Sequence, residues 1–413
     1  MDDFDNCFHV PTDFRRSRLA LALSFALAGC GGDGGSSGSD AASGDDTAGD
    51  AMPLSAAEAG PVVDNYAALV HENYAVTLQR AQDLEAAIDA FVADPTEATH
   101  RAAKDAWLAA REPYGQTESF RFYDGPIDDE AGPEGRLNGW PLDEAYIDYV
   151  DDAPDAGIIN DPSVAITKEM LAGLNEVGGE ENIATGYHAI EFLLWGQDHS
   201  PDGPGDRSFE DFLDTGMAPN PDRRRQYLQV VAELLVEDLT YLVEAWDGAS
   251  SGNFRASFVS LDPNDAVQNM MRGIGALASA ELSEERMNVA YDTKLQEDEH
   301  SCFSDNTHND LLYNFLAIKN VYFGDYGSVS GPGIDTLVEA RDPELAAHLA
   351  EEFAETEALI SAIPAPFDQA IVGDDSAPGR VAVAAAISAL RELGDELVEG
   401  AGTMGITLNV ALE

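Results

Sequence analysis

The sequence is poor in basic residues. Lys and Arg together number 22 against 77 Asp and Glu in a chain of 413 residues, so the formal net charge at pH 7 is −55. A protein that binds nucleic acid presents a basic surface to the phosphates, and one that adheres to an anionic membrane often uses a basic face. This composition excludes both modes of binding. Because 44% of the residues are hydrophobic, the chain has the composition of a globular protein and not of a disordered acidic tail.

Cysteine is scarce as well, and the chain has only Cys7, Cys30 and Cys302. The first two lie within the first 30 residues, which leaves Cys302 alone in the body of the protein. A single cysteine cannot form an internal disulfide, even in the oxidising compartments where disulfides persist. The fold must therefore be stabilised by its hydrophobic core.

Long hydrophobic runs are missing, and the run Leu19–Leu27 is too short to span a bilayer as a permanent helix. Three arginines lie just before it, at positions 15, 16 and 18, and Leu27-Ala28-Gly29-Cys30 ends it. This order is typical of a signal peptide, and the ending resembles the bacterial lipobox, in which Cys30 would become the lipidated first residue. We therefore expect a lipoprotein signal peptide at 1–30 and a flexible Gly/Ser/Asp linker at 31–55. The protein would be exported and attached to a bacterial membrane through the lipid anchor only, facing the periplasm or the cell exterior.

The body of the chain has the spacing of amphipathic helices, with apolar residues three and four positions apart. In residues 66–91, for example, Tyr66, Val70, Tyr74 and Leu84 share one face. Similar stripes occur in 94–112, where Asp94 is expected to cap the helix, and in 223–246, 267–277, 345–360 and 383–397. Strand signals are few, and only 406–412 alternates weakly. The sequence therefore predicts an all-α fold.

Two long segments, about 120–165 and about 292–335, lack this periodicity. Long irregular segments inside a helical protein are usually functional or disordered, and because these contain aromatic residues we expect them to be ordered and functional. The order of helices, irregular insert and helices occurs twice. We therefore expect two helical bundles related by a pseudo-repeat, at 56–250 and 251–413, with the break at Gly248–Asn253.

The first polar constellation lies in an apolar stretch, Gly186–Gly196. His188 and Glu191 are three residues apart, so both side chains project from one face of a helix. An imidazole and a carboxylate on one turn can bind one metal ion. The spacing also occurs by chance in structural or solvated pairs, but the surrounding apolar residues would bury this pair, which then needs a partner.

The second constellation is 297–310, in which His300 and His308 lie among several acids. Two histidines and a lone cysteine in one segment fit a polar site, and they fit a capped, hydrogen-bonded loop equally well. A lone cysteine such as Cys302 is more often a small buried hydrophobe. A third stretch contains Arg111 and Arg121, two of the scarce cations. Ion pairing with neighbouring carboxylates and a ligand contact at a cleft both remain open for these arginines.

The quoted residues resemble a known family. Gly186–Trp195 resembles the Gly-x-His-x-x-Glu signature of imelysin-like proteins. Residues 118–122 (Glu-Ser-Phe-Arg-Phe), 139–144 (Gly-Trp-Pro-Leu-Asp-Glu) and 298–308 (Asp-Glu-His-Ser-Cys-Phe-Ser-Asp-Asn-Thr-His) look like the branch called iron-regulated protein A. The resemblance implies two all-helical bundles with a cleft between them, in an exported and often lipid-anchored protein tied to the acquisition of iron or another metal. The family also carries a metallopeptidase classification, so the resemblance makes metallopeptidase activity a second candidate function.

A pseudo-twofold arrangement would bring the two inserts together across one cleft. We predict metal ligands there, namely His188, Glu191, Glu118, His300, His308 and Glu299, and a lining that includes Gly186, Ser119, Arg121, Asp305 and Cys302. The ion would be divalent or ferric, with iron or zinc as the candidates, and the partners would be membrane or periplasmic components of iron uptake. Metal binding is favoured over a metallopeptidase, because the sequence offers two ligands and no evident general base. A cleft that binds a ligand or a partner protein without metal is the third reading.

Overall fold

The computed structural model describes residues 53–200 and 203–411. The predicted signal peptide, Cys7, Cys30 and most of the predicted linker lie outside these residues. Leu54 is buried, and its backbone N–H donates a hydrogen bond to Asn264 Oδ1 at 2.8 Å. Ser55 caps the first helix through a capping box with Glu58. The last residues of the predicted linker therefore belong to the folded body.

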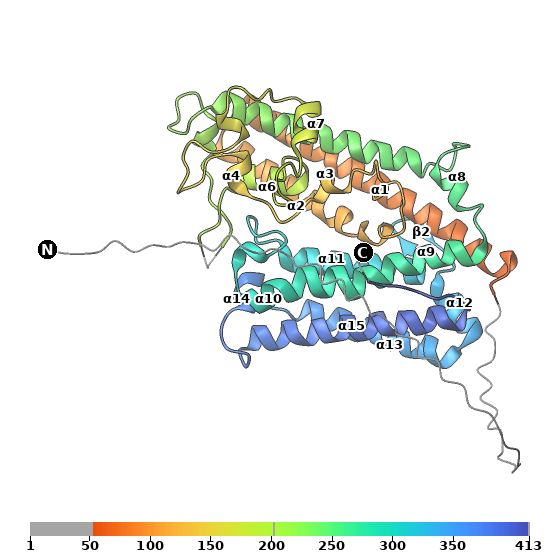
Figure 1. The fold of residues 1–413 in the computed structure, drawn as a ribbon. Coiled ribbons are helices and arrows are strands. Elements are labelled where there is room, and N and C mark those ends of the chain that lie inside the picture. The colour runs from red at the N-terminus through yellow and green to blue at the C-terminus, as the bar shows by residue number, and fades with distance from the viewer. Residues whose placement is uncertain (1–52, 201–202, 412–413) are drawn as a thin grey trace, which may run out of the picture. The chain divides into compact units, whose positions relative to one another are not determined.

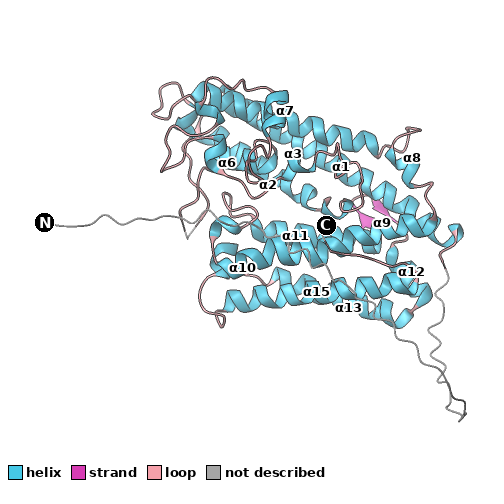
Figure 2. Ribbon diagram, in the orientation of Figure 1, coloured by secondary structure: helices cyan, strands magenta, loops and turns pink. Residues whose placement is uncertain are grey.

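Helices make up nearly all of the regular structure, which confirms the predicted all-α fold (Figures 1 and 2). The elements of the first half are α1 (Ala56–Ala93), α2 (Glu97–Gly115), η1 (Glu118–Phe120), α3 (Glu134–Asn138), α4 (Glu144–Ile147), η2 (Ile158–Asn160), α5 (Lys168–Leu174), α6 (Gly186–Trp195), η3 (Phe209–Phe212) and α7 (Pro221–Ala245). Those of the second half are α8 (Phe254–Phe258), α9 (Pro263–Ala276), η4 (Leu277–Asn288), α10 (Val289–Thr293), η5 (Gln296–Asp298), α11 (Thr307–Phe323), β1 (Asp325–Tyr326), β2 (Val329–Ser330), α12 (Ile334–Arg341), α13 (Pro343–Ser361), α14 (Phe367–Ile371) and α15 (Pro378–Thr403).

The first group of helices is built around the long helix α1. Its predicted apolar stripe is buried, with Tyr66, Val70, Tyr74 and Leu84 almost fully inaccessible. This face packs against α2 and α7, and α2 and α7 both contact α6. Because α6 is covered from several sides, a helix that is apolar all round is stable there.

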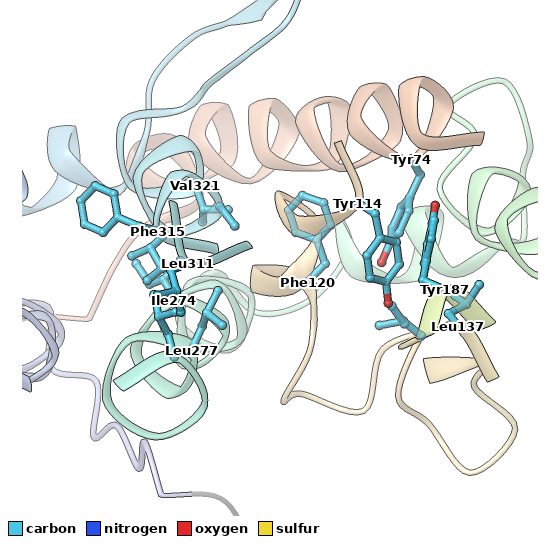
Figure 3. Packing of buried hydrophobic residues seen from close by; sticks show 14 of the residues in the cluster. Tyr74, Tyr114, Phe120, Leu137, Tyr187, Ile274, Leu277, Leu311, Phe315 and Val321 are labelled. Atoms are coloured by element: carbon cyan, nitrogen blue, oxygen red, sulfur yellow. The ribbon is translucent and has the colours of Figure 1, made fainter. Parts of the chain in front are cut away.

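The second group is built around α15, which packs against α13, α9 and η4. Helix α11 contacts α9, η4 and α13 within this group and also contacts α2 of the first group. Buried residues of both groups form one hydrophobic core cluster; Figure 3 shows Tyr114 and Tyr187 from the first group and Ile274 and Phe315 from the second. The predicted domain boundary at residue 250 stays a prediction, although 246–253 does separate α7 from α8.

Three details of the sequence interpretation are wrong. The predicted insert 292–335 contains the helix α11, whose buried residues Leu311, Phe315, Ile318 and Tyr322 recur at helical spacing. Helix α2 is capped by Thr96 instead of Asp94, because Thr96 and Thr99 form a reciprocal capping box. Residues 406–410 form no strand, and the strands in the described part of the chain are the short antiparallel pair β1 and β2.

In the described ranges, no helix combines the length and the apolar character that crossing a membrane requires.

Candidate metal centre

Helix α6 carries His188 and Glu191 into the interior, and all ten of its residues are buried. It begins at Gly186, where φ is +85° and an added Cβ would lie only 2.6 Å from the carbonyl oxygen of Leu137. A glycine is therefore required for α6 to start this close to the backbone of α3. Helix α2 holds the other side of α6, since Trp107 Nε1 donates to the carbonyl oxygen of Tyr187 at 2.9 Å.

Glu191 orients His188. Nδ1 of His188 lies 2.9 Å from Oε2 of Glu191, and Oε1 of Glu191 accepts hydrogen bonds from the backbone N–H and the hydroxyl of Ser304 at 2.9 and 2.7 Å. Burial raises the pKa of Glu191 to about 8. Burial also lowers the pKa of His188 well below its ordinary value, and His300 and Arg111 add to this. The imidazole is therefore neutral at neutral pH, and the carboxyl group lies behind it.

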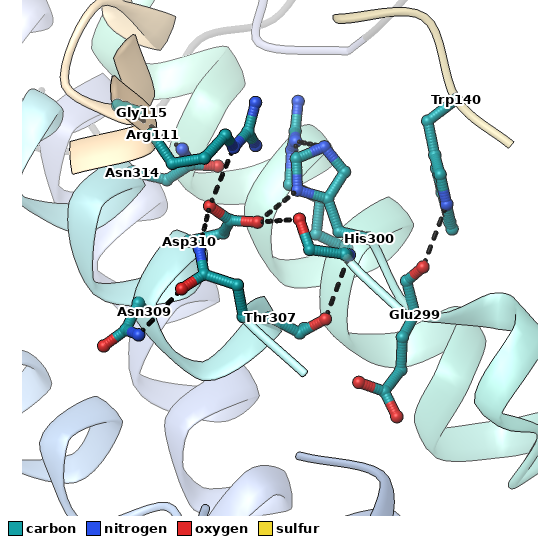
Figure 4. A network of polar contacts seen from close by, with 12 residues as sticks. Arg111, Gly115, Trp140, Glu299, His300, Thr307, Asn309, Asp310 and Asn314 are labelled. Atoms are coloured by element: carbon teal, nitrogen blue, oxygen red, sulfur yellow. Dashed lines mark hydrogen bonds and ion pairs between the residues drawn. The ribbon is translucent and has the colours of Figure 1, made fainter. Parts of the chain in front are cut away.

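His300 is held in the same way from the opposite side. Its Nδ1 lies 3.2 Å from Oδ2 of Asp310, which is on the first turn of α11. Asp310 also accepts from Nε of Arg111 at 3.3 Å and from the hydroxyl of Ser301 (Figure 4). Burial alone would raise the pKa of Asp310, but Arg111 and His300 hold it far below its ordinary value, so this carboxylate stays ionised.

The two imidazoles face each other through their other nitrogens. Nε2 of His188 lies 3.3 Å from Nε2 of His300, and the ring centroids are 4.7 Å apart at an interplanar angle of 68°. Burial, followed by the nearby Arg286, lowers the pKa of His300 to about 4, so this ring is also neutral. In the tautomer whose Nδ1–H donates to the neighbouring carboxyl group, each Nε2 is left as an acceptor. Two acceptors at this separation call for a positive charge between or beside them.

Arg286 provides the positive charge that lies beside His300. It comes from η4, a π-helix that continues α9 without a break; such helices are rare and are often found at functional sites. Nη1 of Arg286 contacts both ring nitrogens of His300, at 3.0 Å for Nδ1. Its Nη2 donates to Oε2 of Glu118 and to Oε1 of Glu281, at 2.8 Å in both cases.

Glu118 is the carboxylate that the first group contributes beside this guanidinium. It is 1% exposed, and it also accepts from Arg121 Nη1 at 2.8 Å and from Asn138 Nδ2 at 3.4 Å. Burial would raise its pKa, but Arg286 and Arg121 outweigh that effect and lower it, so Glu118 is ionised. The adjacent Ser119 is fully buried. Its carbonyl would lie 2.1 Å from a Cβ at Gly273, which shows how closely η1 approaches α9.

The structure does not bring Glu299 and His308 to the facing imidazoles. The carbonyl oxygen of Glu299 accepts from Trp140 Nε1 at 2.9 Å, while its side chain points away from His300 (Figure 4). Burial, followed by the charges of Asp368 and Asp305, raises the pKa of Glu299 well above its ordinary value. His308 is half-buried, and its Nδ1 has no hydrogen-bond partner among the described residues.

Two of the predicted lining residues, Asp305 and Cys302, also have raised pKa values. Burial raises the pKa of Asp305 to about 7, and the charges of Asp198 and Asp368 add to it. Burial raises the pKa of Cys302 well above the usual thiol value, and the charges of Glu191 and Glu299 raise it further. Cys302 is therefore a neutral thiol. Adjacent residues in a turn point in different directions. The predicted ligands of the segment 299–308 therefore do not all point to one cleft.

The residues present fit a metal ion in part. Two nitrogens bound to one tetrahedral ion at ~2.05 Å lie ~3.3 Å apart, which is the observed separation of the two Nε2 atoms. Glu191 and Asp310 occupy the outer positions that typically orient ligating histidines. A third ligand is not in place. No three His, Cys, Asp or Glu residues of this site each offer a ligand atom within 4.8 Å of the other two; among the described residues only His348, Glu352 and Glu396 meet that criterion.

Sequence reasoning singled out His188, Glu191, Glu118 and His300, which the structure brings into one polar network, but it did not single out Asp310 and Arg286, which connect them. Asp310 lies ten residues after His300, and only the reversal of the chain before α11 brings the two together. Arg286 could have been considered for the same reason as Arg111 and Arg121, because basic residues are scarce in this chain. Nothing in the sequence pattern predicted the π-helix that places it.

The site is closed in this structure. His188, Glu191 and His300 are each at most 2% exposed. The cavity of about 530 Å³ that follows α6 is lined by residues such as Gly196, Asp198 and Arg207, and it includes none of these three. An ion would therefore reach the imidazoles only after local movement.

Comparisons with known proteins agree with the architecture. A family model described as imelysin, peptidase M75, matches residues 70–397. Iron-regulated protein A of Synechococcus elongatus is 26% identical over 338 residues, which cover 80% of this chain and 82% of the relative. The crystal structure of a protein described as an iron-regulated protein A precursor, from Parabacteroides distasonis, superposes with a TM-score of 0.63 at 21% identity. The match covers 86% of this chain and 96% of that chain, and it shows a shared fold.

Proposed function

The chain belongs to the imelysin family, and we propose that it binds a transition-metal ion, with iron as the cargo, between His188 and His300. Family membership and the similarity to iron-regulated protein A support a role linked to iron. The observation that carries the proposal is the 3.3 Å separation of two ring nitrogens, each on an imidazole whose Nδ1 lies against a carboxyl group. Zinc is the other candidate, because imidazole nitrogen suits both metals.

In this proposal the two histidines are direct ligands and Glu191 acts behind His188. Glu118 is the candidate third ligand, because it is tied to the same Arg286 that contacts His300. Displacement of that guanidinium would free a carboxylate oxygen and a ring nitrogen at once. Glu299 and His308 are not part of the proposed ligand set.

The geometry favours binding over the second candidate, a metallopeptidase. A metallopeptidase needs three protein ligands, an open position with water, and access for a peptide. Here two ligands face each other and the described residues leave the site closed. The closed site is better suited to holding an ion than to admitting a polypeptide.

Calorimetric titration of protein purified without a His tag tests metal binding. His188→Ala and His300→Ala should each lower the affinity for Fe²⁺ or Zn²⁺ at this site by at least tenfold. His100→Gln is the matched control, since His100 is also buried and bonds the carbonyl of Leu194 at 2.8 Å in the same group of helices. Unchanged affinity in both alanine variants would leave a metal-free binding cleft as the better reading.

We further propose that the protein is exported, is lipid-anchored through Cys30, and acts in iron uptake or iron-responsive physiology at a bacterial membrane. The support is the arginine-rich start, the short apolar run and the Leu27–Cys30 ending. Mass spectrometry of the native protein should find acylated Cys30 at the N-terminus. An intact, unacylated Leu27–Cys30 segment would contradict the anchor without touching the metal proposal.

A further inference from the structure

A second cluster of side chains that can bind a metal ion lies on the second group of helices. His348 and Glu352 are one turn apart on α13, and Glu396 projects from α15, which packs against α13. Nε2 of His348 lies 2.9 Å from Oε1 of Glu396, and Nδ1 lies 3.9 Å from Oε1 of Glu352. One ligand atom from each of the three residues lies within 4.8 Å of the other two.

The second oxygen of Glu396 is available to bind a cation. Its Oε2 is buried and has no hydrogen-bond partner among the described residues, although Oε1 contacts His348. Burial raises the pKa of Glu396, and Glu352 and other nearby glutamates add to the effect against the opposing influence of His348. A buried carboxylate oxygen without a partner is costly. Tyr322 is fully buried, and its hydroxyl also has no partner among the described residues. Burial, followed by the charges of Asp335 and Glu396, raises the pKa of Tyr322.

We propose that His348, Glu352 and Glu396 form a second cation site, for a divalent transition-series ion such as Zn²⁺. One imidazole with two carboxylates suits Zn²⁺ and its neighbours, whereas Ca²⁺ and Mg²⁺ prefer oxygen ligands alone. Ligand atoms on one ion at about 2.1 Å lie about 3–3.5 Å apart. The contact between Nε2 of His348 and Glu396 already fits this separation. Glu352 lies against the other ring nitrogen, so its carboxylate must move toward Nε2 to bind the same ion.

A protonated His348 lying between two glutamates is the alternative arrangement. Such an exposed ion pair contributes about 0–1 kcal/mol, and it leaves Oε2 of Glu396 without a partner. An ion held by both oxygens of Glu396 would satisfy that atom. The exposed side of His348, which is 54% accessible, leaves room for water to complete the coordination.

This site shares no residue with the site at His188 and His300, so it stands independently of the proposed function. The test is calorimetric titration of the full chain with Zn²⁺ alone. Wild type should bind one ion more than His348→Ala, and Glu396→Gln should weaken that ion at least tenfold. The loss should also appear in a chain that carries His188→Ala and His300→Ala. Because His348 is on the surface, its replacement should leave the helical circular dichroism unchanged.

His199→Ala is the matched control, because His199 is similarly exposed and pairs with a single carboxylate, Asp151, at 3.3 Å. It should bind the same number of ions as wild type. If His348→Ala and Glu396→Gln keep the ion count and affinity of wild type, the cluster is an ion pair and the proposal is wrong.

Discussion

Replacing Arg286 should have opposite effects on metal affinity and on stability. In this structure the guanidinium contacts the His300 nitrogen that the proposed ion needs, and it is held there by Glu118 and Glu281. An ion on Nε2 must therefore either displace this charge or be repelled by it. Arg286→Gln removes this repulsion and leaves both carboxylates in place.

The two carboxylates reduce the size of the effect, because in the wild type they partly screen the guanidinium. We expect Arg286→Gln to bind Fe²⁺ or Zn²⁺ at least tenfold more tightly, which corresponds to about 1.4 kcal/mol. Without metal the variant should be less stable by about 3 kcal/mol, at the low end for breaking a buried ion pair. It is at the low end because Arg121 still pairs with Glu118 at 2.8 Å and with Glu281 at 3.5 Å.

Calorimetry gives the affinity, and urea unfolding with and without the ion gives the stability. Arg121→Gln is the matched control, since it removes one guanidinium from the same carboxylates but has no contact with His300. The control should lose stability and gain clearly less affinity than Arg286→Gln. If Arg286→Gln binds the ion no more tightly than wild type, Arg286 does not compete for the proposed position.

Three other substitutions test the packing and the buried charges of the fold. Gly186→Ala should cost about 1–3 kcal/mol in urea unfolding, because φ is +85° and the new Cβ would meet the carbonyl of Leu137; unfolding like that of wild type would contradict this packing of α6 on α3. Asp148→Asn should cost about 3–5 kcal/mol, since it leaves Arg207 and Arg224 buried without their carboxylate, whereas the exposed Asp152→Asn should stay within about 0.5 kcal/mol of wild type. Asp305→Asn should flatten the pH dependence of stability. The pKa of Asp305 is raised to about 7, so the folded state binds a proton that the unfolded chain releases near pH ~4, and wild-type stability falls as pH rises between those values. Equal slopes for variant and wild type, measured by urea unfolding at several pH values, would contradict the burial of Asp305 among acids.

The sequence was most informative where burial follows helical spacing. The stripe of α1 and the apolar surroundings of His188 and Glu191 were predicted from spacing alone, because a buried helix face must be apolar. Helix α11 was missed because its first turn, Thr307–Asp310, is polar and continues a loop of polar residues. The apolar residues at 311, 315, 318 and 322 were present in the sequence, but the polar start concealed their period.

The contacts within the candidate site were harder to predict from the sequence than the helices. The pair of His188 and Glu191 was correctly placed on one helical turn, but Glu191 lies on Nδ1 and orients the ring from behind. The facing nitrogen of His300 depends on Asp310, and the guanidinium of Arg286 depends on a π-helix. Both are long-range or irregular features, which no local pattern encodes. Glu299 and His308 were misplaced because proximity in the chain does not fix the direction of a side chain in a turn.

The most direct test of the metal centre is a crystal structure of the protein loaded with Fe²⁺ or Zn²⁺, with anomalous scattering recorded at the absorption edge of the metal. The proposal predicts a peak about 2.1 Å from Nε2 of both His188 and His300, with the Arg286 guanidinium moved away from His300. Loaded crystals with no anomalous peak between these two nitrogens would contradict the proposal.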